Sequence, residues 1–166
     1  MNWQNKIVFL IIMMCFTVFA ANVPDFTAQD LDFQNTSLNA LKGDKLTIID
    51  FWATWCKPCI KSIPTLNKIQ EQYADKGVKV IGINADSPRN SSKVKPFVST
   101  HKISYPILRD PNAKISTELN VVSYPTLFII NNENEIVYTH IGYRSGDEII
   151  LTTEIEKLLN EKDQNN

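Results

Sequence analysis

The chain has 166 residues, of which 43% are hydrophobic and 21% charged, and its formal net charge is −1 at pH 7. This length and composition describe one globular domain and exclude a disordered chain, while the near-neutral charge excludes the whole-chain basic field that binds nucleic acid. Three cysteines are too few for a scaffold held together by disulfides, so a hydrophobic core must hold the fold.

Residues 1–20 have the three-part layout of a secretory signal peptide. The single charge of Lys6 precedes an apolar run that ends in small residues at Ala20 and Ala21. This run is shorter than the ~20 residues that a helix needs to cross a bilayer. We predict cleavage after Ala20, which leaves residues 21–166 as the folded domain; an uncleaved membrane anchor is the alternative.

Cleavage would remove Cys15 and leave Cys56 and Cys59 as the cysteines of the mature chain. A secretory signal also places the domain in an oxidising compartment, where two nearby cysteines form a disulfide unless something keeps them reduced. We therefore expect a location in the periplasm or at the extracytoplasmic face of the membrane. Contact with the membrane itself is expected only through the N-terminal segment, if it stays uncleaved.

Hydrophobic periodicity predicts a βαβ unit in the first half of the chain. An edge strand or hairpin arm is expected at 25–33, followed by a short helical turn at 37–41. Two apolar runs at 46–51 and 78–84 have the pattern of buried strands, and apolar residues recur at helical spacing between them, at 59–73. Strand, helix and strand in this order predict a parallel pair.

The second half of the chain is predicted to alternate further helices and strands. The expected elements are a helix at 93–101, a strand at 105–108, a helix at 113–119, strands at 126–130 and 136–141, and a helix at about 147–159. Residues 131–134 suit a tight hairpin turn. Leu151, Ile155 and Leu158 form the apolar stripe of the last helix, and residues 161–166 are predicted to be a solvated, fraying tail.

The motif Cys56-Lys57-Pro58-Cys59 runs from a buried strand into the start of a helix. A helix N-terminus favours negative charge and lowers the pKa of a thiol placed there, so we predict Cys56 as the nucleophile. Cys59, one turn further in and more shielded, can attack a mixed disulfide formed at Cys56. The alternatives are a static disulfide or half of a metal site, but His101 and His140 are remote in sequence, and the strand-to-helix placement favours redox chemistry.

Three segments make the chain resemble the thioredoxin superfamily: Asp50 through Cys59, Pro64, and Ser123-Tyr124-Pro125-Thr126. The stretches at 25–27, 37–43 and 51–56, with an extra helix and strand between 86 and 119, resemble its TlpA/ResA-like branch of extracytoplasmic thiol-disulfide oxidoreductases. The resemblance implies an α/β thioredoxin fold: a central mixed sheet flanked by helices, with an N-terminal extension and a central α/β insertion. It also implies an enzyme that reduces selected disulfides.

The resemblance assigns roles to residues around the cysteines. It implies a cis Pro125 against the active-site disulfide, and Tyr124 would offer backbone groups to an extended substrate segment. A carboxylate in an apolar strand is costly unless it is protonated, paired or functional, and the resemblance implies that Asp50 takes the proton of Cys59. Trp55 is expected to shield the cysteines and to supply contact surface. The alternatives are a trans proline and a solvent-exposed Asp50.

Two positions depart from the family pattern, and the dipeptide between the cysteines tunes their chemistry. Gly82 stands on the next strand where thioredoxins commonly place a lysine near the buried acid, and Ser62 stands where the branch commonly has a glutamate. The dipeptide Lys57-Pro58 lacks the histidine of strongly oxidising members, which favours a stable disulfide and a reductant.

The sequence therefore predicts a thiol-disulfide oxidoreductase that reduces disulfides of exported proteins such as apocytochrome c. A membrane thiol-transfer protein would supply its electrons, and no cofactor or metal is expected. One alternative is a thiol peroxidase of the peroxiredoxin type, to which the order of Thr54 ahead of Cys56 gives the sequence a faint resemblance. The other is a non-enzymatic metal-binding chaperone that uses the cysteine pair as ligands.

Overall fold

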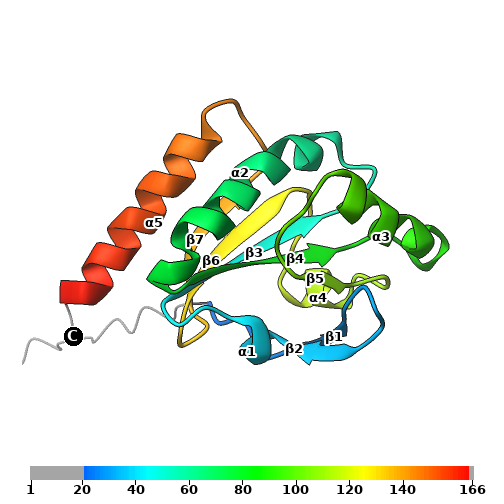
Figure 1. Ribbon diagram of the computed structural model, residues 1–166. Coiled ribbons are helices and arrows are strands. Elements are labelled where there is room, and N and C mark those ends of the chain that lie inside the picture. Colours follow the sequence, from blue (N-terminus) through cyan, green and yellow to red (C-terminus); the bar gives the residue numbers. More distant parts are fainter. Residues whose placement is uncertain (1–20, 165–166) are drawn as a thin grey trace, which may run out of the picture.

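The computed structural model describes residues 21–164 (Figure 1). The predicted signal peptide at residues 1–20 lies outside the described residues, so its cleavage stays a prediction. Within the described part of the chain, no helix combines the length and the apolar character that crossing a membrane requires.

Between residues 21 and 164, seven strands and five α-helices follow one another in nearly the predicted order. The strands are β1 (Thr27–Gln29), β2 (Asn35–Ser37), β3 (Leu46–Trp52), β4 (Val78–Asn84), β5 (Ile107–Arg109), β6 (Thr126–Asn131) and β7 (Ile136–Ile141). The helices are α1 (Leu38–Leu41), α2 (Lys57–Tyr73), α3 (Ser91–Thr100), α4 (Lys114–Glu118) and α5 (Asp147–Gln164). Two 3₁₀ turns lie at Ala74–Lys76 and Pro88–Asn90.

The strands form one mixed sheet with the order β2-β1-β5-β4-β3-β6-β7. β3, β4 and β5 run parallel, whereas β6 and β7 at one side and β1 and β2 at the other pair antiparallel. The unit β3-α2-β4 is the predicted βαβ unit. The fold class predicted from the sequence is thus confirmed, including the N-terminal extension β1-β2-α1 and the central insertion that contributes α3, β5 and α4.

The pleat of β3 distributes its side chains to two hydrophobic cores. Ile48 and Trp52 belong to one core cluster, and Ile49 and Phe51 to the other, because successive side chains of a strand point to opposite faces. Helices α2, α3 and α5 cover the first face, and α1 and α4 cover the second (Figure 1). Asp50 alternates with Ile49 and Phe51, which places it on the face of α2.

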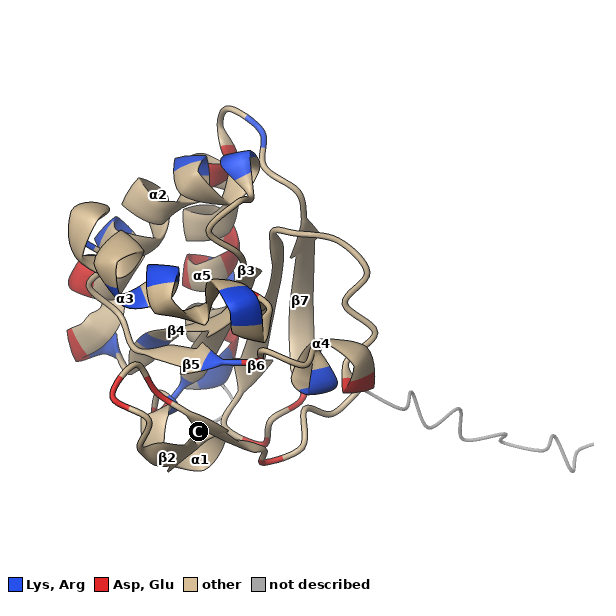
Figure 2. Cartoon of the chain, turned by 90° about the vertical axis from the view of Figure 1, so that its right-hand side faces the viewer, with Lys and Arg blue, Asp and Glu red and all other residues tan. Residues whose placement is uncertain are grey.

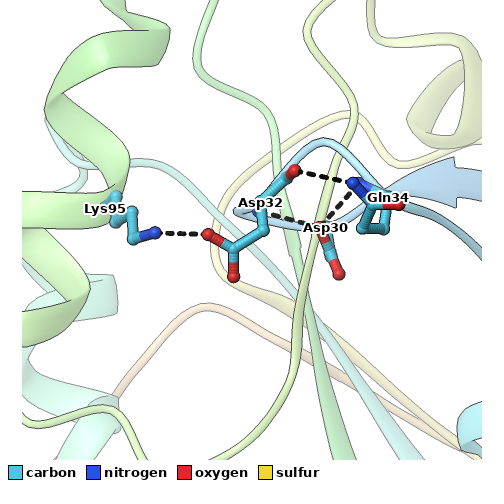
Figure 3. A network of polar contacts seen from close by, with 4 residues as sticks. All are labelled: Asp30, Asp32, Gln34 and Lys95. Atoms are coloured by element: carbon cyan, nitrogen blue, oxygen red, sulfur yellow. Dashed lines mark hydrogen bonds and ion pairs between the residues drawn. The ribbon is translucent and has the colours of Figure 1, made fainter.

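The N-terminal hairpin is tied to the insertion by polar contacts. Asp30 Oδ1 accepts hydrogen bonds from the backbone N–H groups of Asp32 at 2.8 Å and Gln34 at 2.9 Å, which closes the turn between β1 and β2. Figure 3 shows Lys95 of α3 reaching across to form an ion pair with Asp32. The two segments that extend the basic fold therefore support each other at the β2 side of the sheet.

The C-terminal helix is longer than the sequence predicted. The prediction of a fraying tail at residues 161–166 is wrong for residues 161–164, because α5 continues to Gln164; residues 165–166 lie outside the described residues. Lys162 holds this last turn, since its Nζ donates to the Asn132 side chain and lies 3.5 Å from the Lys45 carbonyl oxygen. The buried stripe of α5 also ends at Leu159 rather than Leu158, which is only partly buried.

Charged residues of both signs are interspersed along the helices and loops (Figure 2). Several pair across elements, as Lys68 of α2 does with Glu148 of α5 and Lys76 with Glu156. Such exposed pairs contribute about 0–1 kcal/mol each, so the two apolar cores carry most of the stability.

Candidate active site

Cys56 and Cys59 are joined by a disulfide with an S–S distance of 2.02 Å at the start of α2. Cys56 is the N-cap residue, and the backbone N–H of Cys59 points at its sulfur, with 3.2 Å between nitrogen and Sγ. The predicted difference in shielding is small in this oxidised state, because Cys56 is 4% exposed and Cys59 1%. What distinguishes Cys56 is its place at the helix N-terminus, where N–H groups and the helix dipole favour a negative sulfur.

A buried carboxylate that the sequence analysis missed holds the loop in front of the cysteines. Asp86, 2% exposed, accepts hydrogen bonds from the Thr54 N–H and hydroxyl at 2.7 Å each, and from the Asn84 side chain at 2.8 Å. These bonds fix the segment between β3 and Cys56. Asp86 is distant from Thr54 in the sequence, and only the paired ends of β3 and β4 bring the two residues together.

We expect Asp86→Ala to lower the free energy of unfolding by about 3 kcal/mol, because it leaves buried donors without their charged acceptor. Thr54→Val removes only the hydroxyl bond and should cost about 1 kcal/mol. Urea unfolding of the oxidised proteins measures both values. A loss for Asp86→Ala no larger than that of the exposed Asp75→Ala would show that Asp86 does not hold the loop.

Asp50 lies in the middle of β3 and is 2% exposed. It pairs in register with Gly82 of β4 and Leu127 of β6, so neutral residues flank it on both neighbouring strands. Burial raises the pKa of the Asp50 carboxyl from 3.8 to about 7. A group that exchanges protons near neutral pH therefore lies in the sheet beneath the helix that carries the cysteines.

The structure explains why Gly82, opposite Asp50, carries no side chain. A Cβ at this position would lie 2.5 Å from Ile107 Cδ1 and 2.9 Å from Trp52 Nε1. A lysine at this position does not fit without moving its neighbours. Tyr105 fills part of this space, and burial together with the nearby Asp50 charge raises its pKa well above the usual value.

The segment before β6 has the geometry that the resemblance implied. The Tyr124–Pro125 peptide bond is cis, and Tyr124 packs against the core cluster that contains both cysteines. Trp55 is 61% exposed, and its ring meets the Tyr124 ring edge-on with 5.9 Å between centroids. Trp55 and Tyr124 therefore form one aromatic surface beside the disulfide, while Trp52 is buried in the core.

A small cavity brings further polar residues to Asp50. Its walls include Asp50, Ser62, Pro125, His140 and Asp147. The sequence analysis set His140 aside because it is remote in sequence, but β7 and the start of α5 carry it and Asp147 to the cavity. The sequence contained one signal for the orientation of His140. In the predicted strand at 136–141, alternation of side chains places His140 on the same face as Tyr138.

Comparisons with known proteins agree with this site. The sequence profile of the AhpC/TSA family matches residues 20–139. The thioredoxin-like protein YneN of Bacillus subtilis is 39% identical over 127 residues, covering 76% of this chain and 73% of YneN. The thiol-disulfide oxidoreductase ResA of Bacillus cereus is 34% identical over 126 residues, covering 76% of this chain and 71% of ResA.

Among solved structures, a Chlorobium tepidum protein assigned as the thiol:disulfide interchange protein DsbE has a TM-score of 0.77 at 27% identity. The match covers 84% of this chain and 96% of that one. Fold, cysteine pair and relatives together define the chain as a thiol-disulfide oxidoreductase with a thioredoxin-like fold. It belongs to the AhpC/TSA family.

Proposed function

We propose that the protein is a reductant, which passes two electrons from Cys56 and Cys59 to disulfides of exported proteins. The observation that carries this proposal is the placement of the cysteine pair at the N-terminus of α2, with the buried Asp50 in the strand beneath. The first feature supplies a reactive sulfur, and the second supplies a proton acceptor for the other.

The exchange proceeds in two balanced steps. The Cys56 thiolate attacks one sulfur of the substrate disulfide, forms a mixed disulfide and releases the other substrate sulfur as a thiolate, which takes a proton from water. Cys59 then gives its proton to the Asp50 carboxylate and attacks the Cys56 sulfur. The second substrate sulfur leaves, and the Cys56–Cys59 disulfide seen in the structure is formed.

The substrate segment binds beside the cis Pro125. Within residues 21–164 the Tyr124 backbone forms no hydrogen bond, so its N–H and C=O are available for strand-like pairing with an extended chain. The exposed Trp55 ring adds apolar contact area next to the cysteines. This surface favours an extended polypeptide segment over a small molecule.

Disulfide reduction of exported proteins also requires a location outside the cytoplasm, an electron donor and a substrate. The segment at residues 1–20 supports export, and the names of the relatives ResA and DsbE support disulfide exchange. A protein that stays reducing in an oxidising compartment needs a donor, and a membrane thiol-transfer protein meets this need. Apocytochrome c, whose cysteines must be reduced before haem attachment, is the substrate that we propose.

The reduction potential of the purified protein tests the direction of the reaction. We expect a value nearer to that of thioredoxin, about −270 mV, than to that of DsbA, about −120 mV, because the Lys57-Pro58 dipeptide gives the thiolate little special stabilisation. Equilibration with glutathione redox buffers measures it. A potential close to that of DsbA would make the protein an oxidant, and peroxide consumption without reduction of a protein disulfide would make it a thiol peroxidase.

A further inference from the structure

The cavity beside Asp50 has the size to hold one water molecule, and its walls include polar side chains that such a water could contact. Its volume is about 20 Å³, above the 10–15 Å³ or so that a single water needs. Asp50 lines it from β3, while His140 and Asp147 line it from β7 and α5. Two carboxyl groups and an imidazole thus share one small space, although they come from three different elements.

Asp147, in the wall of this cavity, has one carboxylate oxygen without a hydrogen-bond partner in the described residues. Its side chain is 4% exposed, and its Oδ2 atom accepts from the Arg144 N–H at 2.6 Å and lies 2.9 Å from His140 Nε2. Its Oδ1 atom is buried, and no hydrogen-bond partner for it exists in the described part of the chain. An acceptor left in this state costs roughly 1–3 kcal/mol, and a water in the cavity can donate to it.

Three tyrosines lie near this space, and one of them, Tyr105, just before β5, is close enough to Asp50 for the Asp50 charge to act on it. Tyr138 stacks on the His140 ring with 6.5 Å between centroids, and Tyr143 lines the cavity from the loop before α5. Helix α2 contributes the neutral side chains of Ser62 and Thr65 to the wall. Two carboxylates that share a poorly solvated space repel each other when both are ionised, and a neighbouring imidazole can offset this repulsion by taking up a proton.

We propose that His140 and Asp147 are positioning residues for disulfide exchange, which set the charge of Asp50 and connect it to solvent through one water in the shared cavity. The inference rests on the proposed function, in which Asp50 takes the proton of Cys59. The proton leaves Asp50 in two coupled moves: protonated His140 releases a proton to bulk solvent, and the water then takes the proton of the Asp50 acid as it passes one of its own to the His140 imidazole. His140 suits the release to solvent because its side chain is 18% exposed.

The titration of Asp50 in the oxidised protein tests the coupling directly. Carbon-13 NMR of the aspartate carboxyl groups between pH 4 and pH 9 gives its midpoint in the wild type, Asp147→Asn and His140→Gln. We expect Asp147→Asn to lower the Asp50 midpoint by roughly one pH unit, because a like charge is removed. His140→Gln should raise it, because Asp147 then loses its countercharge. Opposite shifts are a signature that a merely structural role would not produce.

Two matched controls lie outside the cavity. Glu148→Gln removes a carboxylate one residue further along α5, from an exposed pair with Lys68. His101→Gln removes the histidine that stacks on Phe97 with 4.1 Å between ring centroids. Both controls should leave the Asp50 midpoint unchanged. The proposal is overturned if Asp147→Asn and His140→Gln leave the Asp50 midpoint unchanged, as the controls do, or if both move it in the same direction. If Asp147→Asn does not fold, a His140→Gln protein whose Asp50 midpoint is not raised overturns the proposal by itself.

The pH profile of disulfide reduction separates this inference from the proposed function. We expect the midpoint of the profile to move in the same direction as the NMR midpoint in each variant. If Asp50→Asn leaves the profile unchanged, Asp50 is not the proton acceptor, and the proposed mechanism and this inference fail together. If Asp50→Asn changes the profile but Asp147→Asn and His140→Gln do not, this inference alone fails.

Discussion

Reduced protein with the substitution Cys59→Ala should retain its substrate as a mixed disulfide through Cys56, and its multiple-turnover disulfide reduction should fall by roughly a thousandfold or more. The physical reason is that Cys59 supplies the only sulfur in the described chain that is placed to attack Cys56 Sγ, as their disulfide demonstrates. Non-reducing electrophoresis and mass spectrometry of the trapped species measure the first effect, and insulin reduction with a chemical reductant measures the second.

Cys56→Ala is the matched control for this trap. It should lose turnover to the same extent but accumulate no mixed disulfide, because the nucleophile itself is missing. Adducts that form through Cys59 in the Cys56→Ala protein as fast as those that form through Cys56 in the Cys59→Ala protein would contradict the assigned roles. The same trap, applied to an extract of exported proteins, identifies the substrates and tests the proposal of apocytochrome c.

Asp50→Asn should slow turnover by roughly a hundredfold near pH 8, because general-base assistance contributes about 10²–10⁴-fold and the amide cannot accept the proton of Cys59. The wild-type rate should rise with pH through the Asp50 midpoint, since burial raises the pKa of this carboxyl to about 7 and only the carboxylate can act as the base. The variant should lack that rise. Steady-state reduction of a protein disulfide across this pH range measures both profiles.

The same substitution should stabilise the oxidised protein at alkaline pH. In the unfolded chain Asp50 ionises near pH 3.8, whereas in the folded chain it stays protonated up to about pH 7. The folded state therefore binds more protons between these values, so wild-type stability falls as the pH rises through this window and levels off above it. The full window corresponds to roughly 4 kcal/mol.

We thus expect Asp50→Asn to unfold at higher urea concentration than the wild type at pH 8, with a much smaller difference at pH 4.5. Greater stability combined with lower activity would identify Asp50 as a residue kept for chemistry rather than for folding. Equal pH dependence of stability in the two proteins would show that Asp50 ionises as readily in the folded state as in the unfolded chain.

Local patterns predicted most of the fold. The apolar runs of β3 and β4 and the helical spacing between them identify a βαβ unit. A strand that is buried on both faces has apolar residues at consecutive positions, so its pattern is local. Boundaries were less accurate: α2 begins at Lys57 rather than at Cys59, because Cys56 acts as its N-cap. The end of α5 depends on the contacts of Lys162 with residues far away in sequence, which no local pattern contains.

The sequence by itself was enough to indicate thiol-disulfide exchange, from the number of cysteines, their C-x-x-C spacing and their position after a buried strand. That chemistry depends on neighbouring residues at one helix terminus, which a local pattern contains. The surroundings of Asp50 were decided only by the tertiary structure. Pairing of β7 with β6, together with the packing of α5 on the same face of the sheet, places His140 and Asp147 on one cavity with Asp50. Pairing of β3 with β4 brings Asp86 to Thr54. Charges couple through distance in space and through burial, and neither quantity can be read from positions along the chain.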